Sequence, residues 1–432
     1  MPVKTAHCHA FAALLVLTGA ASAQVTKLVS LSSAGTQGDA ASFSPVFSSR
    51  GRYVAFYSDA SNLVPGDTND DEDIFLRDTR TGTTTRVSVD STGAQANWGS
   101  YSPSISADGR YVAFYSEASN LVVGDSNGAN DVFVHDVKTG ITTRVSVDSA
   151  GIEGDERSFY CAISATGRYV AFDSLATNLV PGDTNGWQDV FVHDRLLGTT
   201  TRVSVDSSGA QGNDASNYPG ISADGKRVVF DSRSNNLVAG DTNGSVDIFV
   251  HDLTSGVTLC ASVDPTGLPG NSGNGYTSIS GDGRVVAFTS GSTNLVLGDT
   301  NKTGDVFVRD LVTGQTTRVS VSTAGVEGNG FSTIQTATTL SFDGRFVAFK
   351  SLATNLVPND TNGMQDVFLH DVRLGTTTRM NVDSQGNQAL GGTSSTPAIS
   401  TDGRFVGFYS FAANLVPGDL NGQADVFLRR LW

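Results

Sequence analysis

Ser106-Ala-Asp-Gly-Arg-Tyr-Val-Ala-Phe114, followed by Asp131-Val-Phe-Val-His-Asp136, is the stretch of this 432-residue chain that decides its fold. The same two-part pattern occurs seven times. Its turn glycine recurs every 58 to 61 residues, at Gly51, Gly109, Gly167, Gly225, Gly283, Gly344 and Gly403. A fixed period of this length is the signature of a repeat architecture, in which each repeat is one supersecondary unit that stacks on its neighbours.

The second repeat indicates how one unit is built. Runs that alternate with period two predict four strands, at residues 102–106, 111–116, 131–135 and 142–147. Asp108-Gly109 predicts a tight hairpin turn between the first two strands. Both faces of the second strand are apolar, as expected of a sheet covered on both sides by like sheets. The sequence therefore predicts an all-β protein, a single seven-bladed β-propeller of four-stranded antiparallel blades, with the second-strand Phe side chains buried between blades.

The two ends of the repeat region complement each other. Residues 25–32 match the fourth strand of the other units, such as residues 142–148, whereas the chain stops after a third strand at residues 425–432. We therefore expect the N-terminal strand to complete the last blade, which removes the exposed edge of an open array. Residues 24–432 are then one propeller domain.

The first 23 residues have the pattern of a secretory signal peptide. Lys4 is followed by an apolar core at residues 11–17 and by the small-residue cleavage site Ala21-Ser-Ala23. This pattern predicts export, to the periplasm or the extracellular space. No later run reaches the ~20 apolar residues of a membrane span, so no membrane insertion is expected. Cys161 and Cys260 occupy different repeat positions, which argues against a disulfide between them.

The composition is acidic, with a formal net charge of −15. Such a surface repels nucleic acid and anionic lipid and attracts cations. We therefore expect no nucleic-acid partner, and we expect the chain to act as a monomer.

The repeated pattern Ser-x-Asp-Gly-Arg-x-Val-Ala-Phe, followed by Asp-Val-Phe-Val-x-Asp, resembles the TolB-type, WD-like β-propeller repeat of bacterial periplasmic and secreted proteins. The resemblance covers residues 25–432. It implies a propeller fold and does not imply one activity, because propellers carry many unrelated functions. TolB carries an additional α/β domain before its propeller, and these residues contain no counterpart of it.

The connection between the second and third strands carries the most regular polar motif, Gly-Asp-Thr-Asn-Gly-x-x-Asp. Two interpretations remain open. Oxygen ligands at alternating positions of a Gly-containing loop suit Ca²⁺, whereas an Asx-stabilised turn would use the same side chains to satisfy backbone N–H groups. The loop at residues 67–73, with four Asp and one Glu, is the first candidate for Ca²⁺. The candidate metal ligands in the first three repeats are Asp67, Asn69, Asp71, Asp73, Asp125, Asn127, Asp131, Asp183, Asn185 and Asp189.

All four histidines after the predicted signal occupy one repeat position. The other three repeats have Arg at this position, which predicts a cation paired with a nearby carboxylate. Because no histidine stands at a position unique to one repeat, a histidine-dependent acid–base mechanism is not favoured. The seven residues are His135, His193, His251, His370, Arg77, Arg309 and Arg429.

Departures from the repeat gather on the loops that enter the first strands and join the second strands to the third. In a propeller these loops share one face, so aromatic and charged side chains would surround an axial pocket that suits a sugar or peptide. The alternative is that the aromatic side chains pack against blade edges. The candidate ligand-face residues are Trp98, Tyr101, Glu153, Asp155, Arg157, Tyr160, Trp187, Tyr218 and Tyr276.

These observations predict a non-catalytic binding or scaffolding module that acts through its acidic loop face. Its partner would be a protein, a peptide or a carbohydrate, and its only expected cofactor is Ca²⁺. The alternative function is a polysaccharide-acting lyase or hydrolase with a metal-bearing propeller. The dense charged group at residues 153–157 would then have to supply the acid and base.

Overall fold

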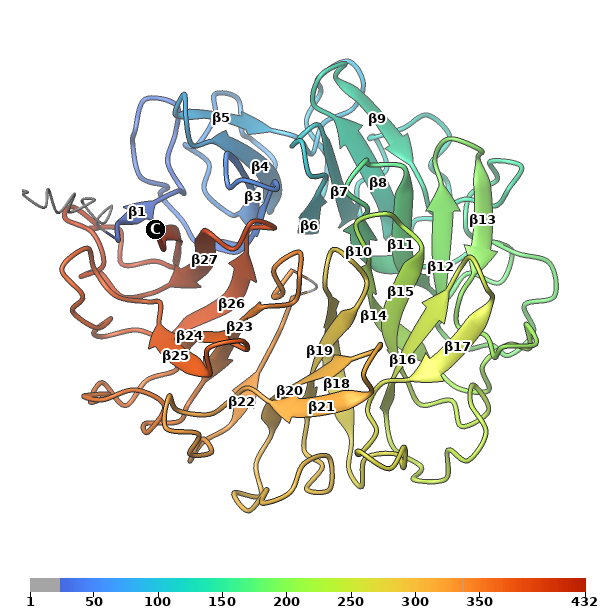
Figure 1. Cartoon of the computed structure of the whole chain (residues 1–432). Helices are drawn as coiled ribbons and strands as arrows, with labels where there is room; N and C mark the ends of the chain where they lie inside the picture. Colours follow the sequence, from blue (N-terminus) through green and yellow to red (C-terminus); the bar gives the residue numbers. More distant parts are fainter. Residues whose placement is uncertain (1–23, 337) are drawn as a thin grey trace, which may run out of the picture.

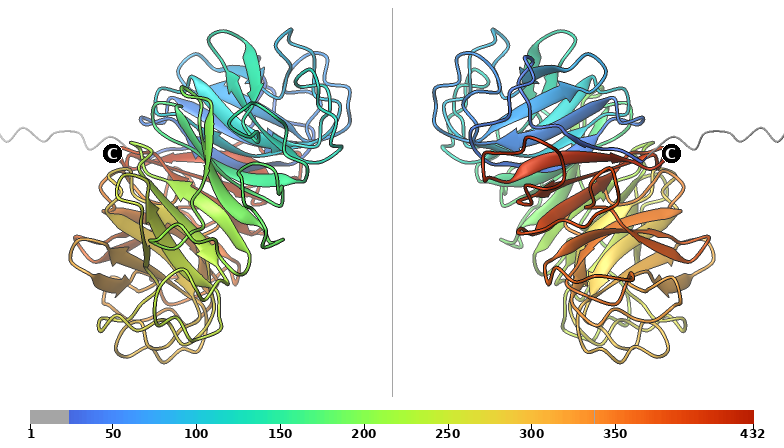
Figure 2. Two further views of the ribbon diagram at one scale, coloured as in Figure 1. Left: turned by 90° about the vertical axis from the view of Figure 1, so that its right-hand side faces the viewer. Right: turned by 90° about the vertical axis from the view of Figure 1, so that its left-hand side faces the viewer.

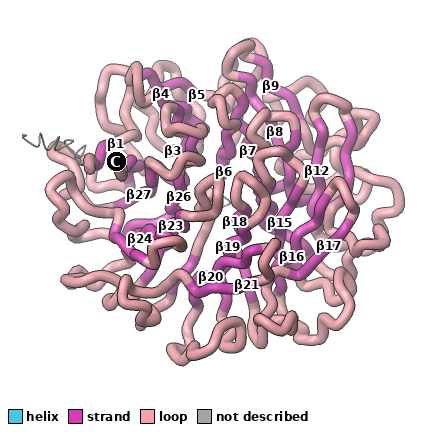
Figure 3. Tube along the Cα trace, viewed as in Figure 1, coloured by secondary structure: helices cyan, strands magenta, loops and turns pink. Residues whose placement is uncertain are grey.

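The computed structural model describes residues 24–336 and 338–432. The predicted signal peptide at residues 1–23 lies outside this range. The described residues form 28 β-strands, arranged as seven four-stranded antiparallel sheets around a central axis (Figure 1). Figure 3 shows the strands joined by loops and turns. The predicted all-β, seven-bladed propeller is confirmed. The described part of the chain has no helix with the length and apolar character that a membrane crossing requires.

Each blade runs from an inner strand at the axis to an outer strand at the rim. Blade 1 contains β2 Ser42–Phe47, β3 Tyr53–Ser58, β4 Asp73–Asp78 and β5 Thr83–Arg86. Blade 2 contains β6 Ser100–Ile105, β7 Tyr111–Ser116, β8 Asp131–Asp136 and β9 Ile141–Arg144. Blade 3 contains β10 Ser158–Ile163, β11 Tyr169–Ser174, β12 Asp189–Asp194 and β13 Thr199–Arg202. Blade 4 contains β14 Ser216–Ile221, β15 Arg227–Ser232, β16 Asp247–Asp252 and β17 Val257–Cys260.

The remaining three blades follow the same order. Blade 5 contains β18 Asn274–Ile279, β19 Val285–Ser290, β20 Asp305–Asp310 and β21 Gln315–Arg318. Blade 6 contains β22 Ser332–Thr333, β23 Phe346–Ser351, β24 Asp366–Asp371 and β25 Thr376–Arg379. Blade 7 contains β26 Ser394–Ile399, β27 Phe405–Ser410, β28 Asp425–Arg430 and β1 Thr26–Leu28. The outer strands are shorter than predicted, because the chain leaves the sheet early to form the bridge Val147↔Glu153 and its counterparts.

The sequence forms these blades for local reasons. Gly109 in the first hairpin turn has φ +76°, and a Cβ there would lie 2.2 Å from the ring of Tyr53 in the neighbouring blade, so only glycine fits. In the sheet, Phe114 pairs with Phe133, and both side chains are fully buried. All seven second-strand Phe side chains are buried as predicted, namely Phe56, Phe114, Phe172, Phe230, Phe288, Phe349 and Phe408.

The propeller closes through the N-terminal strand. β1 pairs antiparallel with β28, with Thr26 opposite Arg429 and Leu28 opposite Phe427. The guanidinium of Arg429 also donates to Thr26 Oγ1 at 2.8 Å. Figure 2 shows the described start of the chain next to its end. The predicted interlock between the two ends is therefore confirmed.

A circle of backbone hydrogen bonds joins the seven blades near the hairpin turns between first and second strands. One N–H···O=C bond of 2.9–3.1 Å links each blade to the next. The donors are Ser49, Ala107, Ala165, Ala223, Asp282, Phe342 and Asp402, and the acceptors are Ala107, Ala165, Ala223, Gly281, Phe342, Thr401 and Ser49. The circle fixes the distance between blades at this face of the propeller.

Candidate functional site

The first strand of each blade faces the axis, and in most blades it bulges where the chain enters from the loop face. The register against the second strand shifts at this point, for example between Tyr101 and Ser104. The bulged residue is in the left-handed region, with φ between 42° and 50°, at Ser44, Ser102, Tyr218, Tyr276 and Thr396. This conformation costs free energy for a residue other than glycine. The same local irregularity therefore recurs around the axis, close to a cavity.

A cavity of about 100 Å³ lies at the axis between these bulges. Tyr160, Tyr218 and Tyr276 line one side of it, and Ser44, Ser102 and Gln335 line the remainder together with other first-strand residues. We call these six residues the axial mouth.

A second cavity of about 290 Å³ lies further toward the hairpin-turn face. It adjoins the first, because Ser104 and Thr338 line both cavities. The second cavity is mostly apolar and is ringed by Phe47, Ile105, Ile163, Ile221, Ile279, Leu340 and Ile399.

An arc of aromatic rings extends from the axial mouth around the loop face. The ring centroids of Tyr160 and Tyr218 are 4.5 Å apart, and those of Tyr218 and Tyr276 are 5.3 Å apart. Tyr115 continues the arc 5.8 Å from Tyr160, and Tyr101 follows 5.4 Å from Tyr115. Tyr160 is 38% exposed. The arc therefore presents ring surface and phenol groups to whatever enters the axial mouth.

The second strands contribute a set of seven structurally equivalent residues beside the first-strand bulges. We call this set the second-strand ring, and no residue type fills it in all blades. Its members are Tyr57, Tyr115, Asp173, Asp231, Thr289, Lys350 and Tyr409. The charged members depart most from the repeat. Sequence patterning missed them because they lie inside strands, and the only signal was variation at one fixed repeat position.

Two buried carboxyl groups of the second-strand ring lie next to the tyrosines. Asp173 Oδ2 accepts the backbone N–H of Tyr218 at 2.9 Å and so supports its left-handed conformation. Burial raises the pKa of Asp173 to about 7, although the hydrogen bonds from Tyr218 and Gln188 favour the carboxylate. Burial likewise raises the pKa of Asp231 to about 7. At neutral pH these two groups are therefore partly protonated.

Lys350 is the only Lys or Arg in the second-strand ring. Its ammonium group donates to Gln335 Oε1 at 2.5 Å and to Ser395 Oγ at 3.1 Å. Ser395 Oγ in turn lies 3.1 Å from Gln335 Oε1. Lys350 is half-buried, and burial lowers its pKa. Because Gln335 lines the axial mouth, these three polar side chains stand beside the cavity away from Tyr160 and Tyr218.

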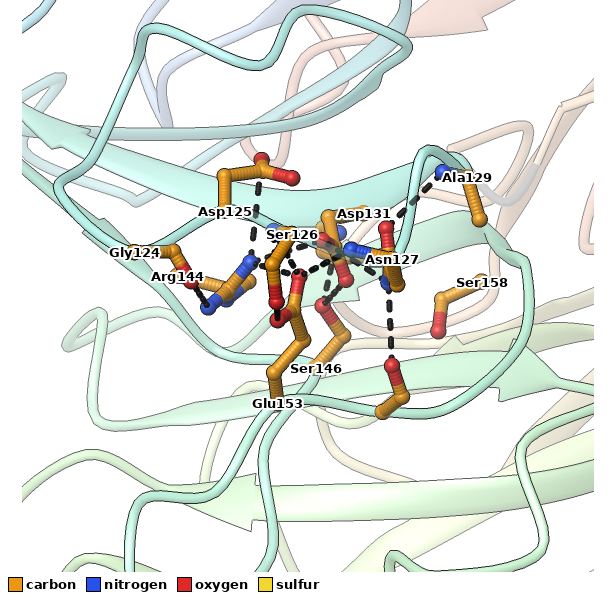
Figure 4. Close-up of polar contacts among 12 residues, drawn as sticks. Gly124, Asp125, Ser126, Asn127, Ala129, Asp131, Arg144, Ser146, Glu153 and Ser158 are labelled. Atoms are coloured by element: carbon orange, nitrogen blue, oxygen red, sulfur yellow. Dashed lines mark hydrogen bonds and ion pairs between the residues drawn. The ribbon is translucent and has the colours of Figure 1, made fainter.

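The acidic turns of the loop face are organised by arginine. In blade 2, Arg144 Nη1 lies 3.6 Å from Asp125, 3.0 Å from Asp131 and 2.6 Å from Glu153 (Figure 4). Ligand atoms of the three carboxylates lie within 4.8 Å of one another, so the group could hold a metal ion. Burial and the charge of Asp131 raise the pKa of Asp125 to about 6. In the structure Arg144 supplies the positive charge that a metal ion would bring.

The same arrangement recurs in the neighbouring blades. Arg86 pairs with Asp67 and Asp73 at 3.2 and 3.1 Å. Arg202 pairs with Asp183 and Asp189 at 3.1 and 3.2 Å. The guanidinium therefore bridges the first and last Asp of the motif in each of these loops.

The Asn of the motif closes the turn. Asn127 Oδ1 accepts the N–H of Ala129 at 2.8 Å, and its amide donates to Gly154 O at 2.9 Å. Asn185 accepts the N–H of Trp187 at 2.9 Å, and Asn69 accepts that of Asp71 at 3.4 Å. These contacts are those of the Asx turn that was one of the two interpretations.

In the 67–73 loop Asp67 and Asp73 lie close together, whereas Glu72 has a different partner. Asp67 and Asp73 accept hydrogen bonds from the side-chain amide of Gln95, at 2.8 and 2.9 Å, in addition to their contacts with Arg86. Glu72 accepts the phenol of Tyr101 at 2.9 Å instead. Each of these three carboxylates therefore has partners within the protein.

Blade 4 departs from this pattern. Cys260 stands opposite Phe249 in the sheet, where five of the other blades have arginine and blade 7 has Leu28. Asp247 is held by Ser262 Oγ and by the amide of Asn243, each at 2.6 Å. Asp241, the first Asp of the motif, is also buried. Cys260 and Cys161 are both free thiols, as expected from their unequal repeat positions.

The predicted ligand-face residues separate into two groups. Tyr160, Tyr218 and Tyr276 come together at the axial mouth, with Tyr101 further along the arc. The other group belongs to the loops. Trp98 and Trp187 are 55% and 49% exposed, whereas Glu153 joins the Arg144 cluster. Arg157 is exposed, and Asp155 accepts the N–H of Thr177 at 2.7 Å.

The prediction that the repeated His or Arg position pairs with a carboxylate is wrong. His135 Nδ1 lies 2.9 Å from Thr142 Oγ1, and the other three histidines contact the equivalent threonine. Arg77 donates to Leu31 O at 2.8 Å and to Thr84 Oγ1. The fourth-strand threonine also bonds a backbone carbonyl of the preceding blade, as Thr84 does to Leu31 O. This position therefore ties neighbouring blades together at the outer strands.

Comparisons with known proteins agree with the fold. No protein-family model matches the chain, and no curated protein sequence matches it. A solved oligogalacturonate lyase in complex with manganese is 12% identical, with a TM-score of 0.55, over 95% of this chain and 94% of that chain. An oligogalacturonate lyase from Vibrio parahaemolyticus is 12% identical, with a TM-score of 0.52, over 95% and 97%.

TolB proteins are among the matches as well. TolB from Acinetobacter baumannii is 15% identical, with a TM-score of 0.41, over 79% of this chain and 64% of that chain. At such identities a likeness shows the fold alone. In this chain, the repeat that resembles the TolB type builds seven four-stranded blades.

Proposed function

We propose that this protein is a binding module that takes an oligosaccharide at the axial mouth. The observation that carries the proposal is the arc of tyrosine rings beside a cavity on the propeller axis. Tyr160, Tyr218 and Tyr276 contribute adjoining rings that suit the C–H faces of sugar rings. Hydroxyl and amide groups from Ser44 and Gln335 line the same cavity and can bond sugar hydroxyls.

A binding role is preferred to a catalytic one because of where the titratable groups lie. The four histidines of the described residues contact outer-strand threonines, for example His193 with Thr200. Asp173 and Asp231 are buried in the blades, and Asp173 supports the bulge at Tyr218. A lyase or hydrolase remains the second candidate, and the fold likeness to oligogalacturonate lyase is the observation that favours it. Release of unsaturated uronate products from a panel of polysaccharides would establish the lyase.

The test of the binding proposal uses Tyr160→Ala against a matched aromatic variant, Trp187→Ala. Both side chains are exposed, but only Tyr160 lines the axial mouth. Wild-type protein is screened on an array of neutral and acidic oligosaccharides, and hits are titrated by calorimetry. Loss of a stacking ring is expected to weaken binding about tenfold, from ~1.4 kcal/mol. Trp187→Ala is expected to bind like wild type. Absence of any saccharide binding, or binding that ignores Tyr160→Ala, would refute the proposal.

A second proposal concerns a cation at the acidic turns, with Ca²⁺ as the candidate. Asp125, Asp131 and Glu153 support it, because Ca²⁺ binds through carboxylate oxygens and these groups converge. Since Arg144 already contacts all three, Ca²⁺ has to displace its guanidinium. Calcium binding stabilises the folded state by ~2.7 kcal/mol at a hundred times its dissociation constant.

Thermal melts with Ca²⁺, with Mg²⁺ and with a chelator test the cation proposal. A calcium-dependent rise in Tm that disappears in Glu153→Gln supports the blade 2 site. A rise that disappears only in the double variant Asp71→Ala, Asp73→Ala supports the 67–73 loop, which was the first candidate from the sequence. A Tm that is unchanged by all three additions would refute the cation proposal at both sites.

We also propose that the protein is exported, on the strength of the signal pattern that ends at Ala23. N-terminal sequencing of protein recovered from the periplasm or the medium is expected to begin at Gln24. Recovery of chains that retain residues 1–23 would contradict export by this route.

A further inference from the structure

Lys350 is a half-buried cation for which the protein supplies no counter-charge. It forms no ion pair with any described carboxylate, and every Asp and Glu of the chain lies in the described ranges. Its two hydrogen-bond partners, Gln335 Oε1 and Ser395 Oγ, are neutral. A partly buried charge without an opposite charge is costly, since burial removes water and no ion pair replaces it.

The fold does not require a cation at this position. The structurally equivalent residues of three other blades are Tyr57, Tyr115 and Tyr409, whose rings fill the same place in the second-strand ring. Tyr57 and Tyr115 pack there against the apolar side chains of the neighbouring blade interface. A tyrosine would therefore satisfy the packing between blades 6 and 7 as well. Packing within the protein therefore does not explain why this residue is charged.

The position of Lys350 relates it to the axial mouth. Gln335, which accepts its ammonium group, lines the cavity together with Tyr160, Tyr218 and Tyr276. Lys350 and Gln335 belong to blade 6, whereas the three tyrosines belong to blades 3, 4 and 5. One end of a ligand can thus lie on the rings while another part reaches the polar groups of blade 6.

We infer that the ligand of the axial mouth is an acidic oligosaccharide, with a carboxylate that Lys350 binds while a sugar ring lies on the tyrosines. The inference rests on the proposed saccharide-binding function and names the class of saccharide. A carboxylate supplies the charge that Lys350 lacks and accepts hydrogen bonds from its ammonium group and from the amide of Gln335. Lys350 is then the residue that determines the preference for acidic over neutral sugars.

The test compares neutral oligosaccharides with counterparts of equal length and linkage that are oxidised to the carboxylate at C6. Wild type, Lys350→Gln and Lys350→Arg are titrated against both members of each pair. Lys226→Gln serves as the matched control, because Lys226 is exposed beside a hairpin turn at the opposite face. It makes the same change in net charge. Circular dichroism and melting curves establish that each variant is folded.

We expect wild type to prefer the carboxylated member roughly tenfold or more, as a charge-assisted hydrogen bond implies. Lys350→Gln is expected to remove this preference and leave binding of the neutral member unchanged. Lys350→Arg and Lys226→Gln are expected to retain it. Equal binding of both members, sensitive to Tyr160→Ala, would overturn the inference and leave the proposed function standing. Binding of neither member anywhere in the panel would overturn both.

Discussion

Replacing Asp173 by Asn is expected to stabilise the protein at alkaline pH and to do so progressively less as the pH falls. Asp173 is fully buried, and its pKa is raised from 3.8 to about 7 in the folded state. Between these two values the folded protein keeps a proton that the unfolded chain has released. The contribution of Asp173 to the free energy of unfolding is therefore fully present below pH ~4. It is lost as the pH rises through 7. Asparagine carries no charge at any of these pH values.

The size of this effect on the free energy of unfolding follows from the shift in the pKa of Asp173. Each unit of pKa difference corresponds to ~1.4 kcal/mol, so the penalty of ionising Asp173 accumulates to ~4 kcal/mol above pH 7. About 3 kcal/mol of it falls between pH 5 and pH 8. The amide oxygen that Asp173→Asn introduces can still accept the N–H of Tyr218, which Asp173 accepts at 2.9 Å. The geometry of the Tyr218 bulge is thus expected to survive the substitution.

Urea unfolding at pH 5 and at pH 8 measures the effect. The free energy of unfolding of Asp173→Asn should exceed that of wild type by ~3 kcal/mol more at pH 8 than at pH 5. Asp70→Asn, at an exposed position, is the matched control and should show the same difference from wild type at both pH values. An effect of Asp173→Asn that is equal at the two pH values would refute the reasoning.

Three further predictions concern the scaffold. Phe114→Ala should lower the free energy of unfolding by ~3–5 kcal/mol in urea, because it leaves a cavity between two blades. Deletion of residues 25–32 should leave the edge of β28 unpaired, so that the protein aggregates or melts at a markedly lower temperature. An unchanged melting temperature would contradict the interlock. Cys260→Arg should raise the free energy of unfolding by ~1–3 kcal/mol, because the new guanidinium can pair with both Asp241 and Asp247. An unchanged or lower value would contradict this account of the acidic turns.

The sequence predicted the fold because the fold is set by local signals that repeat. The hairpin glycine, the two phenylalanines of each sheet and the complementary chain ends are all visible without tertiary information. The loop-face tyrosines were also predictable, since Tyr160, Tyr218 and Tyr276 interrupt the repeat where the chain approaches the axis.

The charged residues of the second-strand ring could not be predicted in the same way. Asp173 and Lys350 lie within strands, and only the folded structure brings Asp173 to Tyr218 of the next blade and Lys350 to Gln335 of its own blade. The histidine prediction failed for a related reason. The pattern showed that a polar group was needed in every blade, but the partner of His135 is a threonine on the next strand and not a charge.

The circle of hydrogen bonds around the axis treats blade 7 and blade 1 like any other neighbours, since Asp402 donates to Ser49 as Ala107 does to Ala165. The position of the chain ends is therefore arbitrary with respect to the architecture. Joining residue 432 to residue 24 by a short linker would convert β28 and β1 into an ordinary hairpin. Opening the turn at Gly198 would then make β13 the first strand, and blade 3 would be closed by two ends of the chain. Circular permutants of this protein should keep the axial mouth, because its residues depend on the order of the blades and not on where the chain begins.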